Sequence, residues 1–270
     1  MRKLLLTLAA AAAITLPQSS VAQLAPPNSD GITWGHVHMF IGDPDPLKKL
    51  FVGVLGGQIT NAGSLELIKF PGAMVIVTKT RTAPTEGSDG SVLNHFTLKV
   101  KNLAELKPKL VDAGAKVVSE KGKNEVLFMF PEKIQVELVE DKSNTQPVMF
   151  RNVELHSVDP EKLRAWYIKT FPGGKAGKKG DLLTLTYTAG EIDFKKVATA
   201  QAPSKGRSLD HMGLEIVNLE AFCKRLQAEH PDVTFDTTYR EMAQLGGLKL
   251  AYVVDPEGTR IELTEGFGSK

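Results

Sequence analysis

The chain lacks several features that would assign it to a protein class at once. Its single cysteine, Cys223, leaves no partner for a disulfide within the chain, which excludes the small secreted scaffolds that depend on such bridges. Its 33 Lys and Arg residues are nearly balanced by 31 Asp and Glu residues. Such a balance gives no basic excess for binding nucleic acid or an anionic membrane. Cys223 lies in "LEAFCKRLQAEH", where helical spacing favours a buried core thiol.

Long hydrophobic runs are also scarce, apart from one at the start of the chain. Residues 1–22 combine Arg2 and Lys3 with an apolar run and a small-residue exit, "SVA". This pattern is typical of a signal peptide, with cleavage expected after Ala22, and the run is short for a membrane span. We therefore expect a periplasmic or secreted protein that is formally neutral and has no membrane segment after cleavage. An uncleaved anchor is the alternative.

An internal repeat is the most informative feature. The stretches "NHFTLKVKN" (94–102) and "DHMGLEIVN" (210–218) each place a histidine seven residues before an asparagine. The same interval separates His36 from Asp43 and Asn152 from Asp159. In each copy the Asp or Asn suits a helix N-cap, and apolar residues at helical spacing follow it. Alternating segments then close the copies, so each predicts a β-α-β-β-β module: "SLELIKF", "EVLFMF", "DLLTLTY" and "LKLAYVV".

Four such modules predict an α+β fold of two domains. The expected parts are a tail at 23–33, a first domain at 34–140 (modules 34–80 and 92–140), a linker at 141–148 and a second domain at 149–268 (modules 149–197 and 208–266). The polar, turn-forming linker favours pairing of consecutive modules. Pairing of the first module with the fourth is the alternative that the repeat leaves open.

The repeat places ligand-type side chains at equivalent strand positions. Consecutive pairing would gather His36, His95 and Glu137, with Val77 at the fourth corner. Two imidazoles and one carboxylate can hold a divalent metal and leave coordination positions open, and iron, zinc, manganese and nickel all accept this set. Separate core histidines, each bonded to backbone, are the alternative interpretation.

The second half of the chain carries a less complete set at the equivalent positions: Asn152, either Phe194 or Asp193, His211 and Glu262. Under the exchanged pairing, the metal ligands would be His36, His211 and Glu262, so His36 belongs to both candidate sets.

Three further histidines need an interpretation. His38 lies two residues from His36, on the same strand face, and is a candidate acid–base group. His156 shares its face with Asn152 and is a candidate shifted ligand. His230, in "AEHPD", is expected at a helix end.

The modules, together with "DHMGLEIVNLEAF" and "DPEGTRIELTEG", resemble the vicinal-oxygen-chelate superfamily. This superfamily includes glyoxalases, bleomycin-resistance proteins and type I extradiol dioxygenases. The resemblance covers the chain from about Trp34 to Gly266. It implies paired modules, metal ligands on their first and last strands, and a small substrate with adjacent oxygens.

The resemblance also implies an activity. We expect an exported enzyme with one divalent metal, either a glyoxalase-like lyase or isomerase or an extradiol dioxygenase-like oxidoreductase, in which Glu137 is both ligand and proton acceptor. The dioxygenases place an acid–base histidine and a tyrosine near the metal, yet residues 34–140 contain no tyrosine. A monomer and a homodimer both fit.

Two non-catalytic functions remain as alternatives. One is small-molecule binding of the bleomycin-resistance type, and the other is a degenerate pair of domains kept for an interaction surface. A groove rich in aromatic residues would favour the first; the candidates for it are Trp34, Phe40, Phe70, Phe96 and Phe128.

Overall fold

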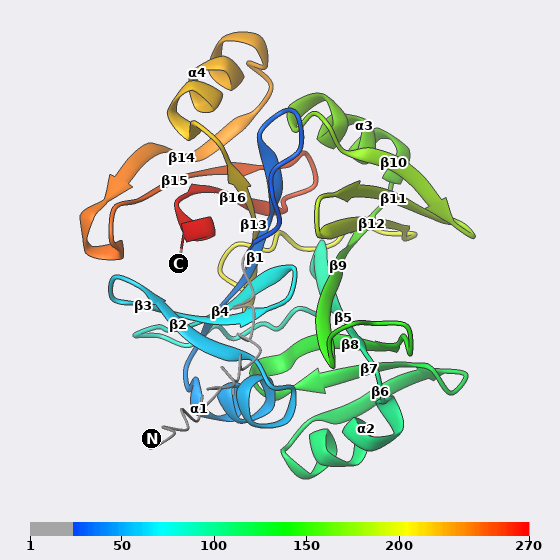
Figure 1. The fold of residues 1–270 in the computed structure, drawn as a ribbon. Helices are drawn as coiled ribbons and strands as arrows, with labels where there is room; N and C mark the ends of the chain where they lie inside the picture. Colours follow the sequence, from blue (N-terminus) through cyan, green and yellow to red (C-terminus); the bar gives the residue numbers. More distant parts are fainter. Residues whose placement is uncertain (1–23, 270) are drawn as a thin grey trace, which may run out of the picture.

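The computed structural model describes residues 24–269, so the predicted signal peptide lies outside the described residues. Four β-α-β-β-β modules follow one another along the chain (Figure 1), which confirms the predicted α+β class. Within the described part, no helix combines the length and apolarity needed to cross a bilayer.

The first two modules contain one very short helix and one regular helix. Module 1 comprises β1 (Ile32–Ile41), α1 (Asp45–Lys48) continued by a π-helical segment (Lys49–Val54), β2 (Gln58–Ala62), β3 (Leu65–Phe70) and β4 (Ala73–Lys79). Module 2 comprises β5 (Leu93–Val100), α2 (Leu103–Asp112), β6 (Lys116–Lys121), β7 (Glu125–Phe130), a 3₁₀ turn (Pro131–Lys133) and β8 (Ile134–Glu140).

The last two modules repeat this order. Module 3 comprises β9 (Val148–Ser157), α3 (Pro160–Thr170), β10 (Lys175–Lys179), β11 (Leu182–Tyr187) and β12 (Gly190–Lys196). Module 4 comprises β13 (Leu209–Ile216), α4 (Leu219–Glu229), β14 (Thr234–Met242), a 3₁₀ turn (Ala243–Leu245), β15 (Leu248–Val254) and β16 (Arg260–Glu265), followed by a 3₁₀ turn (Phe267–Ser269).

The modules pair in the exchanged order, not consecutively. One eight-stranded sheet, which we call sheet A, runs β14-β15-β16-β13-β1-β4-β3-β2 and joins module 1 to module 4. The other, sheet C, runs β10-β11-β12-β9-β5-β8-β7-β6 and joins module 2 to module 3. The expected domains at 34–140 and 149–268 are therefore wrong as units.

The linker explains this correction. Residues 141–147 connect β8 to β9, which both lie in sheet C with only β5 between them, so this segment is a loop within one sheet. The longer segments 80–92 and 197–208 instead carry the chain from sheet A to sheet C and back. Polar composition marks a loop in each case and does not reveal which sheet the next strand joins.

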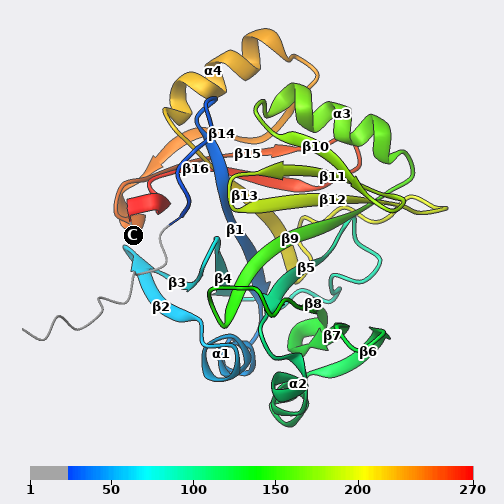
Figure 2. The same ribbon diagram turned by 45° about the vertical axis from the view of Figure 1, so that its right-hand side comes forward.

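Consecutive modules still meet, but through their cores. The main apolar cluster lies on the helix side of both sheets, and Phe51 of module 1 contacts Phe96 and Phe130 of module 2 with ring centroids 6.0 and 5.4 Å apart. Trp34 of β1 stacks on Phe150 of β9 at 5.0 Å and 19°. Figure 2 shows β1 and β9 side by side where the two sheets meet. The two sheets therefore share one core.

The predicted N-caps are correct in two of the four modules. The side chains of Asn102 and Asp159 accept hydrogen bonds from the backbone N–H of Glu105 and Lys162, both at 3.1 Å. Asn218 adopts a left-handed conformation, with φ of 56°, and does not cap. The N–H of Leu219 instead donates to a side-chain oxygen of Glu265 at 2.8 Å, which satisfies the first turn of α4 from the end of β16.

We expect Trp34→Ala to lower the free energy of unfolding by about 3–5 kcal/mol, because it empties a fully buried site at the junction of the two sheets. Urea denaturation would measure the change. Val217→Ala, at a side chain 59% exposed, is the control and should change stability by less than about 0.5 kcal/mol. Equal effects of the two substitutions would contradict a shared core between the sheets.

Candidate metal centre

Four ligand-type side chains meet on the face of sheet A that points away from the helices. His36 and His38 come from β1, His211 from β13 and Glu262 from β16. Each offers a ligand atom, these atoms all lie within 4.8 Å of one another, and all four residues are buried. Successive strand residues alternate between faces, so these side chains oppose the apolar residues that contact the helices. Module exchange thus assembles the alternative ligand set, with His38 added.

The Glu262 carboxylate is the centre of the cluster. Its Oε2 lies 2.8 Å from Nε2 of His36 and 3.1 Å from Nε2 of His211. Neighbouring ligand atoms around an octahedral metal with bonds of about 2.1 Å are separated by about 3 Å. The separations in the cluster match this value. His36, His211 and Glu262 therefore fit a divalent metal with little rearrangement.

A glycine makes room for one of these imidazoles. His36 stands opposite Gly213 across the β1–β13 ladder, and a Cβ at Gly213 would lie 2.0 Å from Cε1 of His36. The equivalent pair in sheet C is Asn152 opposite Thr97. The Thr97 hydroxyl there donates to Oε2 of Glu137 at 3.0 Å. The glycine thus allows a histidine at this position of sheet A, whereas the threonine in sheet C faces a shorter side chain.

A second layer of contacts orients His211. Nδ1 of His211 lies 2.7 Å from Oδ1 of Asp210, which also accepts a hydrogen bond from Nη1 of Arg260 at 2.8 Å. A carboxylate cannot donate, so Nδ1 carries the proton and Nε2 faces Glu262. This carboxylate–histidine arrangement is the usual support of a histidine ligand.

Charges inside the cluster are mutually dependent. Burial alone would raise the pKa of Glu262, but hydrogen bonds from His211 and His36 outweigh burial and hold that pKa well below its ordinary value. Burial would lower the pKa of His211, yet Asp210 and Glu262 raise it. Burial, followed by repulsion from His211, lowers the pKa of His38 well below its usual range. The charged form of His211 is therefore favoured by the same two carboxylates, Asp210 and Glu262, whose charge it offsets.

Two buried ring nitrogens without hydrogen-bond partners provide a second test of whether the cluster suits a metal. Nδ1 of His36 and Nδ1 of His38 are buried and have no hydrogen-bond partner. Buried polar atoms normally have partners. His38 also contacts Thr78, whose Oγ1 lies 2.8 Å from Nε2. Together with its lowered pKa, this leaves His38 neutral with one ring nitrogen available, as a ligand or an acid–base group requires.

The fourth corner is Ile76, and the prediction of Val77 was wrong by one residue. Glu262 pairs with Gly213, two positions after His211. The related residue of β4 pairs with His38, two positions after His36, and this residue is Ile76. Val77 pairs with Met39 and lies in the main core. The corner is apolar, as expected, because Ile76 and Val77 are both aliphatic.

Module exchange also brings a tyrosine to the cluster. The Tyr252 ring lies 5.2 Å from the His211 ring, and its register partner on β16 is Glu262. The Arg260 guanidinium lies 3.9 Å from the centre of the same ring. Sequence reasoning missed Tyr252 because consecutive pairing leaves it in the other domain. The pattern "LKLAYVV" against "RIELTE" would have located it once modules 1 and 4 were paired.

The preferred set of His36, His95 and Glu137 is not assembled, because His36 lies in sheet A and the other two in sheet C. Nε2 of His95 is 3.8 Å from Oε2 of Glu137. Nδ1 of His95 lies 2.9 Å from Oδ1 of Asn94. A cavity of about 180 Å³ adjoins them. His156, the proposed shifted ligand, instead pairs with Glu154 at 2.9 Å.

Lysine side chains supply positive charge next to the carboxylates of the sheet C cluster. Lys121 lies 3.8 Å from Glu137, and Lys195 lies 3.3 Å from Glu154. At the fourth corner of this sheet, Asp193 rather than Phe194 pairs in register with Glu154. It lies 3.4 Å from a lysine of β10, Lys179. Since each of these carboxylates has an ammonium neighbour, the cluster resembles a set of ion pairs more than an open metal site.

The remaining expectations have clear outcomes. Cys223 is buried, and burial raises the pKa of its thiol to about 11, as for a core thiol. His230 ends α4, its N–H bonded to the carbonyl of Leu226. The aromatic groove that would favour the small-molecule-binding alternative does not form among the described residues, because four of its five candidate members lie in the main core: Trp34, Phe70, Phe96 and Phe128. Phe40, the fifth, contacts the ring of His38 at 4.7 Å.

Comparison with known proteins yields matches among structures only. No family sequence model and no curated protein matches the chain. Glyoxalase I from Zea mays aligns with a TM-score of 0.68 and 17% identity over 88% of this chain and 94% of that one, and a point mutant of the same protein aligns at 0.71 with 16% identity over 88% and 95%. A putative dioxygenase from Bacillus subtilis aligns at 0.62 with 16% identity over 90% and 88%. At these identities the likeness establishes the fold alone, which is similar to that of glyoxalase I.

We expect Gly213→Ala to weaken metal binding by about 10- to 100-fold, because the added methyl group displaces the His36 imidazole. Isothermal titration of metal-free protein with Zn²⁺ or Mn²⁺ would measure this loss. Gly53→Ala is the control, since a Cβ there meets nothing within 4 Å. Unchanged affinity in Gly213→Ala would show that His36 is not a ligand.

The sheet C cluster generates a prediction about acid stability. Burial would raise the pKa of Glu137, but contacts with His95, Glu125 and Thr97 lower it to about 2. Because the folded-state pKa lies below the unfolded value of about 4.5, the interaction stabilises the protein above about pH 5 and is lost as the pH falls towards 2. Glu137→Gln should therefore be less stable than wild type by up to about 3 kcal/mol at pH 7, with the gap closing by pH 2.5. Urea denaturation across this range is the measurement, and a gap independent of pH would contradict the assignment.

Proposed function

We propose that this protein, with its vicinal-oxygen-chelate fold, is a metal-dependent enzyme that acts on a small substrate with adjacent oxygens. The convergence of His36, His211 and Glu262 supports the proposal most directly, because their ligand atoms already have the spacing that a divalent metal requires. A metal held there would supply Lewis-acid stabilisation of negative charge developing on a substrate oxygen. Glu262 takes the ligand role that the sequence suggested for Glu137.

Other residues would orient the ligands, accept a proton and bind a substrate oxygen. Asp210 and Arg260 fix the orientation of His211, so its Nε2 stays directed at Glu262. His38 is neutral and keeps Nδ1 without a partner, so it can accept a proton from a substrate hydroxyl. Burial raises the pKa of Tyr252, and Glu262 and Asp210 raise it further. Tyr252 thus stays protonated and can donate a hydrogen bond to a substrate oxygen.

Two reaction types agree with the fold, and the geometry favours one of them. The three-residue set, the apolar Ile76 at the fourth corner, and the nearby His38 and Tyr252 together resemble the arrangement expected of an extradiol ring-cleaving dioxygenase. A glyoxalase-like lyase or isomerase is the second candidate, and its fourth protein ligand would have to be His38, the fourth member of the cluster.

We also propose that the protein acts outside the cytoplasm. The proposal rests on the leader-like composition of residues 1–22. Edman sequencing or mass spectrometry of periplasmic protein would test it, and a mature chain beginning at Gln23 is the expected result.

Metal content is the decisive test of the proposed function. We expect protein purified without chelators and reconstituted with Fe²⁺, Mn²⁺ or Zn²⁺ to bind about one equivalent, and His36→Ala, His211→Ala and Glu262→Gln each to lose most of it. His95→Ala, the matched control in sheet C, should keep it. Elemental analysis after gel filtration gives the stoichiometry. Absence of metal from the wild-type protein would leave a non-catalytic binding protein.

The reaction type is tested on the loaded protein. Oxygen uptake with catechols in the presence of Fe²⁺ would support ring cleavage, and turnover of 2-oxoaldehyde–thiol adducts without oxygen uptake would support the glyoxalase-like reaction. His38→Ala should lower kcat by about 10²- to 10⁴-fold in either case if it transfers the proton, while leaving metal content intact in the ring-cleaving case.

A further inference from the structure

The candidate metal centre is shielded from solvent by the C-terminal segment of the chain. His36 and His211 are fully buried, and the ring of Phe267 stands edge-on to the His36 ring at 5.2 Å and 83°. Figures 1 and 2 show this segment, in red, beside sheet A, and the ring contact with His36 places Phe267 on the face that holds the cluster. Phe267 is itself 1% exposed. It therefore occupies space next to a ligand, where a substrate would have to bind.

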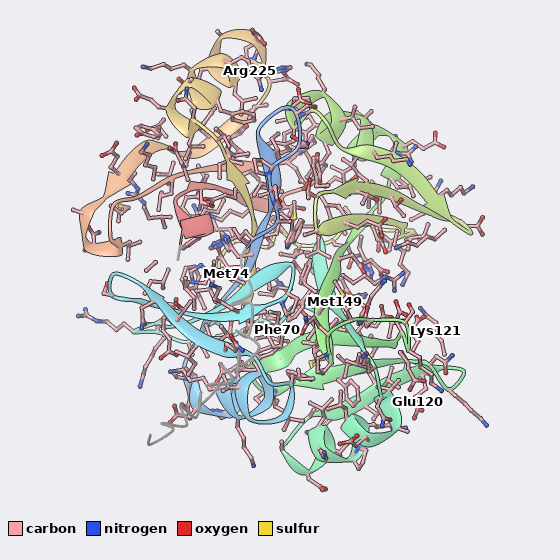
Figure 3. All side chains as sticks on the ribbon, viewed as in Figure 1. Phe70, Met74, Glu120, Lys121, Met149 and Arg225 are labelled. Carbon is pink, nitrogen blue, oxygen red and sulfur yellow. The ribbon has the colours of Figure 1, made fainter. Side chains whose placement is uncertain are left out.

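The surroundings of Phe267 form an apolar pocket that is separate from the main core. Met74 and Ile76, which line it, are the register partners of His36 and His38 on β4, so the pocket begins directly beside the ligands. Met74 is labelled in Figure 3. Its other members come from β2, β3, β15 and the N-terminal tail: Ala62, Leu67, Leu248 and Leu24. Phe267 and Leu24 come from the two ends of the described chain and fill this pocket.

Hydrogen bonds to one carboxylate hold the segment in place. The Glu215 carboxylate accepts hydrogen bonds from the N–H groups of Gly266, at 2.7 Å, and Gly268, at 3.2 Å. Thr264 donates to its other oxygen at 2.7 Å. Gly266 has a φ of 122°, which a residue with a side chain rarely adopts. Phe267 thus lies between two glycines whose N–H groups are both bonded to the Glu215 carboxylate.

Space for movement lies beside the segment. A cavity of about 410 Å³ adjoins Gly268 and Glu215. Its other walls are the N-terminal stretch 24–27, Thr33 and residues 216–217. This cavity provides space next to Gly268 into which the segment could move.

We propose that residues 266–269 form a lid, and that Phe267, with Leu24, occupies the place of an apolar group of the substrate. The idea rests on the proposed function and extends it to a substrate class. The substrate is a small compound with two adjacent oxygens and an apolar group of about phenyl size, because that group must replace a phenylalanine ring against Leu67, Met74 and Ile76. Opening breaks the contacts of Glu215 and moves Phe267 away from His36.

Histidine accessibility tests the lid without any metal. Diethyl pyrocarbonate modifies unprotonated ring nitrogens of histidine, and His36 is the reporter because the Phe267 ring lies against it and its buried Nδ1 has no hydrogen-bond partner. We expect His36 in metal-free Phe267→Ala to react about tenfold faster than in wild type, as read by peptide mass spectrometry. Leu245→Ala is the matched control, since Leu245 packs against the same apolar cluster, and it should react like wild type. Phe267→Leu should give an intermediate rate, and thermal melts confirm that each variant folds.

Ligand preference tests the substrate class on the metal-loaded protein. Phe267→Ala should bind 4-phenylcatechol at least about tenfold more tightly than wild type does, with a smaller change for unsubstituted catechol. Equal His36 modification rates in Phe267→Ala and wild type would overturn the lid while leaving a metal-binding protein intact. A wild-type protein without metal would overturn the proposed function, and the modification rates would still decide whether the segment is a lid.

Discussion

The antiparallel pairing of β1 with β13 is the interaction on which the rest of the structure depends. It joins the first and last modules into sheet A and aligns His36 with Gly213 and His38 with His211. A slip of one residue in this ladder would direct the histidines into the helix-side core and the apolar residues into the site. Within module 4, β16 pairs with β13, so the β1–β13 ladder also brings His36 within reach of Glu262, which contacts both imidazoles. Register in one ladder therefore determines both the closure of the fold and the composition of the cluster.

Sheets A and C show how a duplicated scaffold can give two different clusters. Both keep a histidine on the first strand of one module and a glutamate on its last strand, and in each case these two strands pair in parallel. In sheet A the additional groups are imidazoles, which are neutral ligands. In sheet C the carboxylates have lysine neighbours, and an ammonium group supplies positive charge without offering an electron pair to a metal. Substitutions at a few positions therefore change a metal-type cluster into a set of ion pairs.

Much of the fold follows from the sequence, and the pairing of modules does not. The repeat of His and Asn or Asp predicts four modules because local periodicity and N-caps act within about 50 residues of chain. Which module lies beside which depends on long-range contacts such as Trp34 with Phe150, and neither residue carries a pattern that identifies its partner. The ligand types were predictable for the same reason: His36, His211 and Glu262 belong to the repeat. Tyr252 and Ile76 could not be placed before the strand register was known.

Burial of the cluster couples its chemistry to its charge. Hydrogen bonds from His211 and His36 lower the pKa of the buried Glu262 and favour its ionised form, and Asp210 and Glu262 in turn raise the pKa of His211. A divalent metal bound in place of the proton between Nε2 of His211 and Glu262 would keep a positive charge beside that carboxylate. Metal binding would then exchange one cation for another at ligands that are already close together, and would require little movement of them. In the proposed lid, the part of the site that would move is apolar: the ring of Phe267 against Ile76 and Met74. The polar groups would then be fixed in advance where charge develops in the proposed reaction, and the adaptable part would be the one that contacts the apolar group of the substrate.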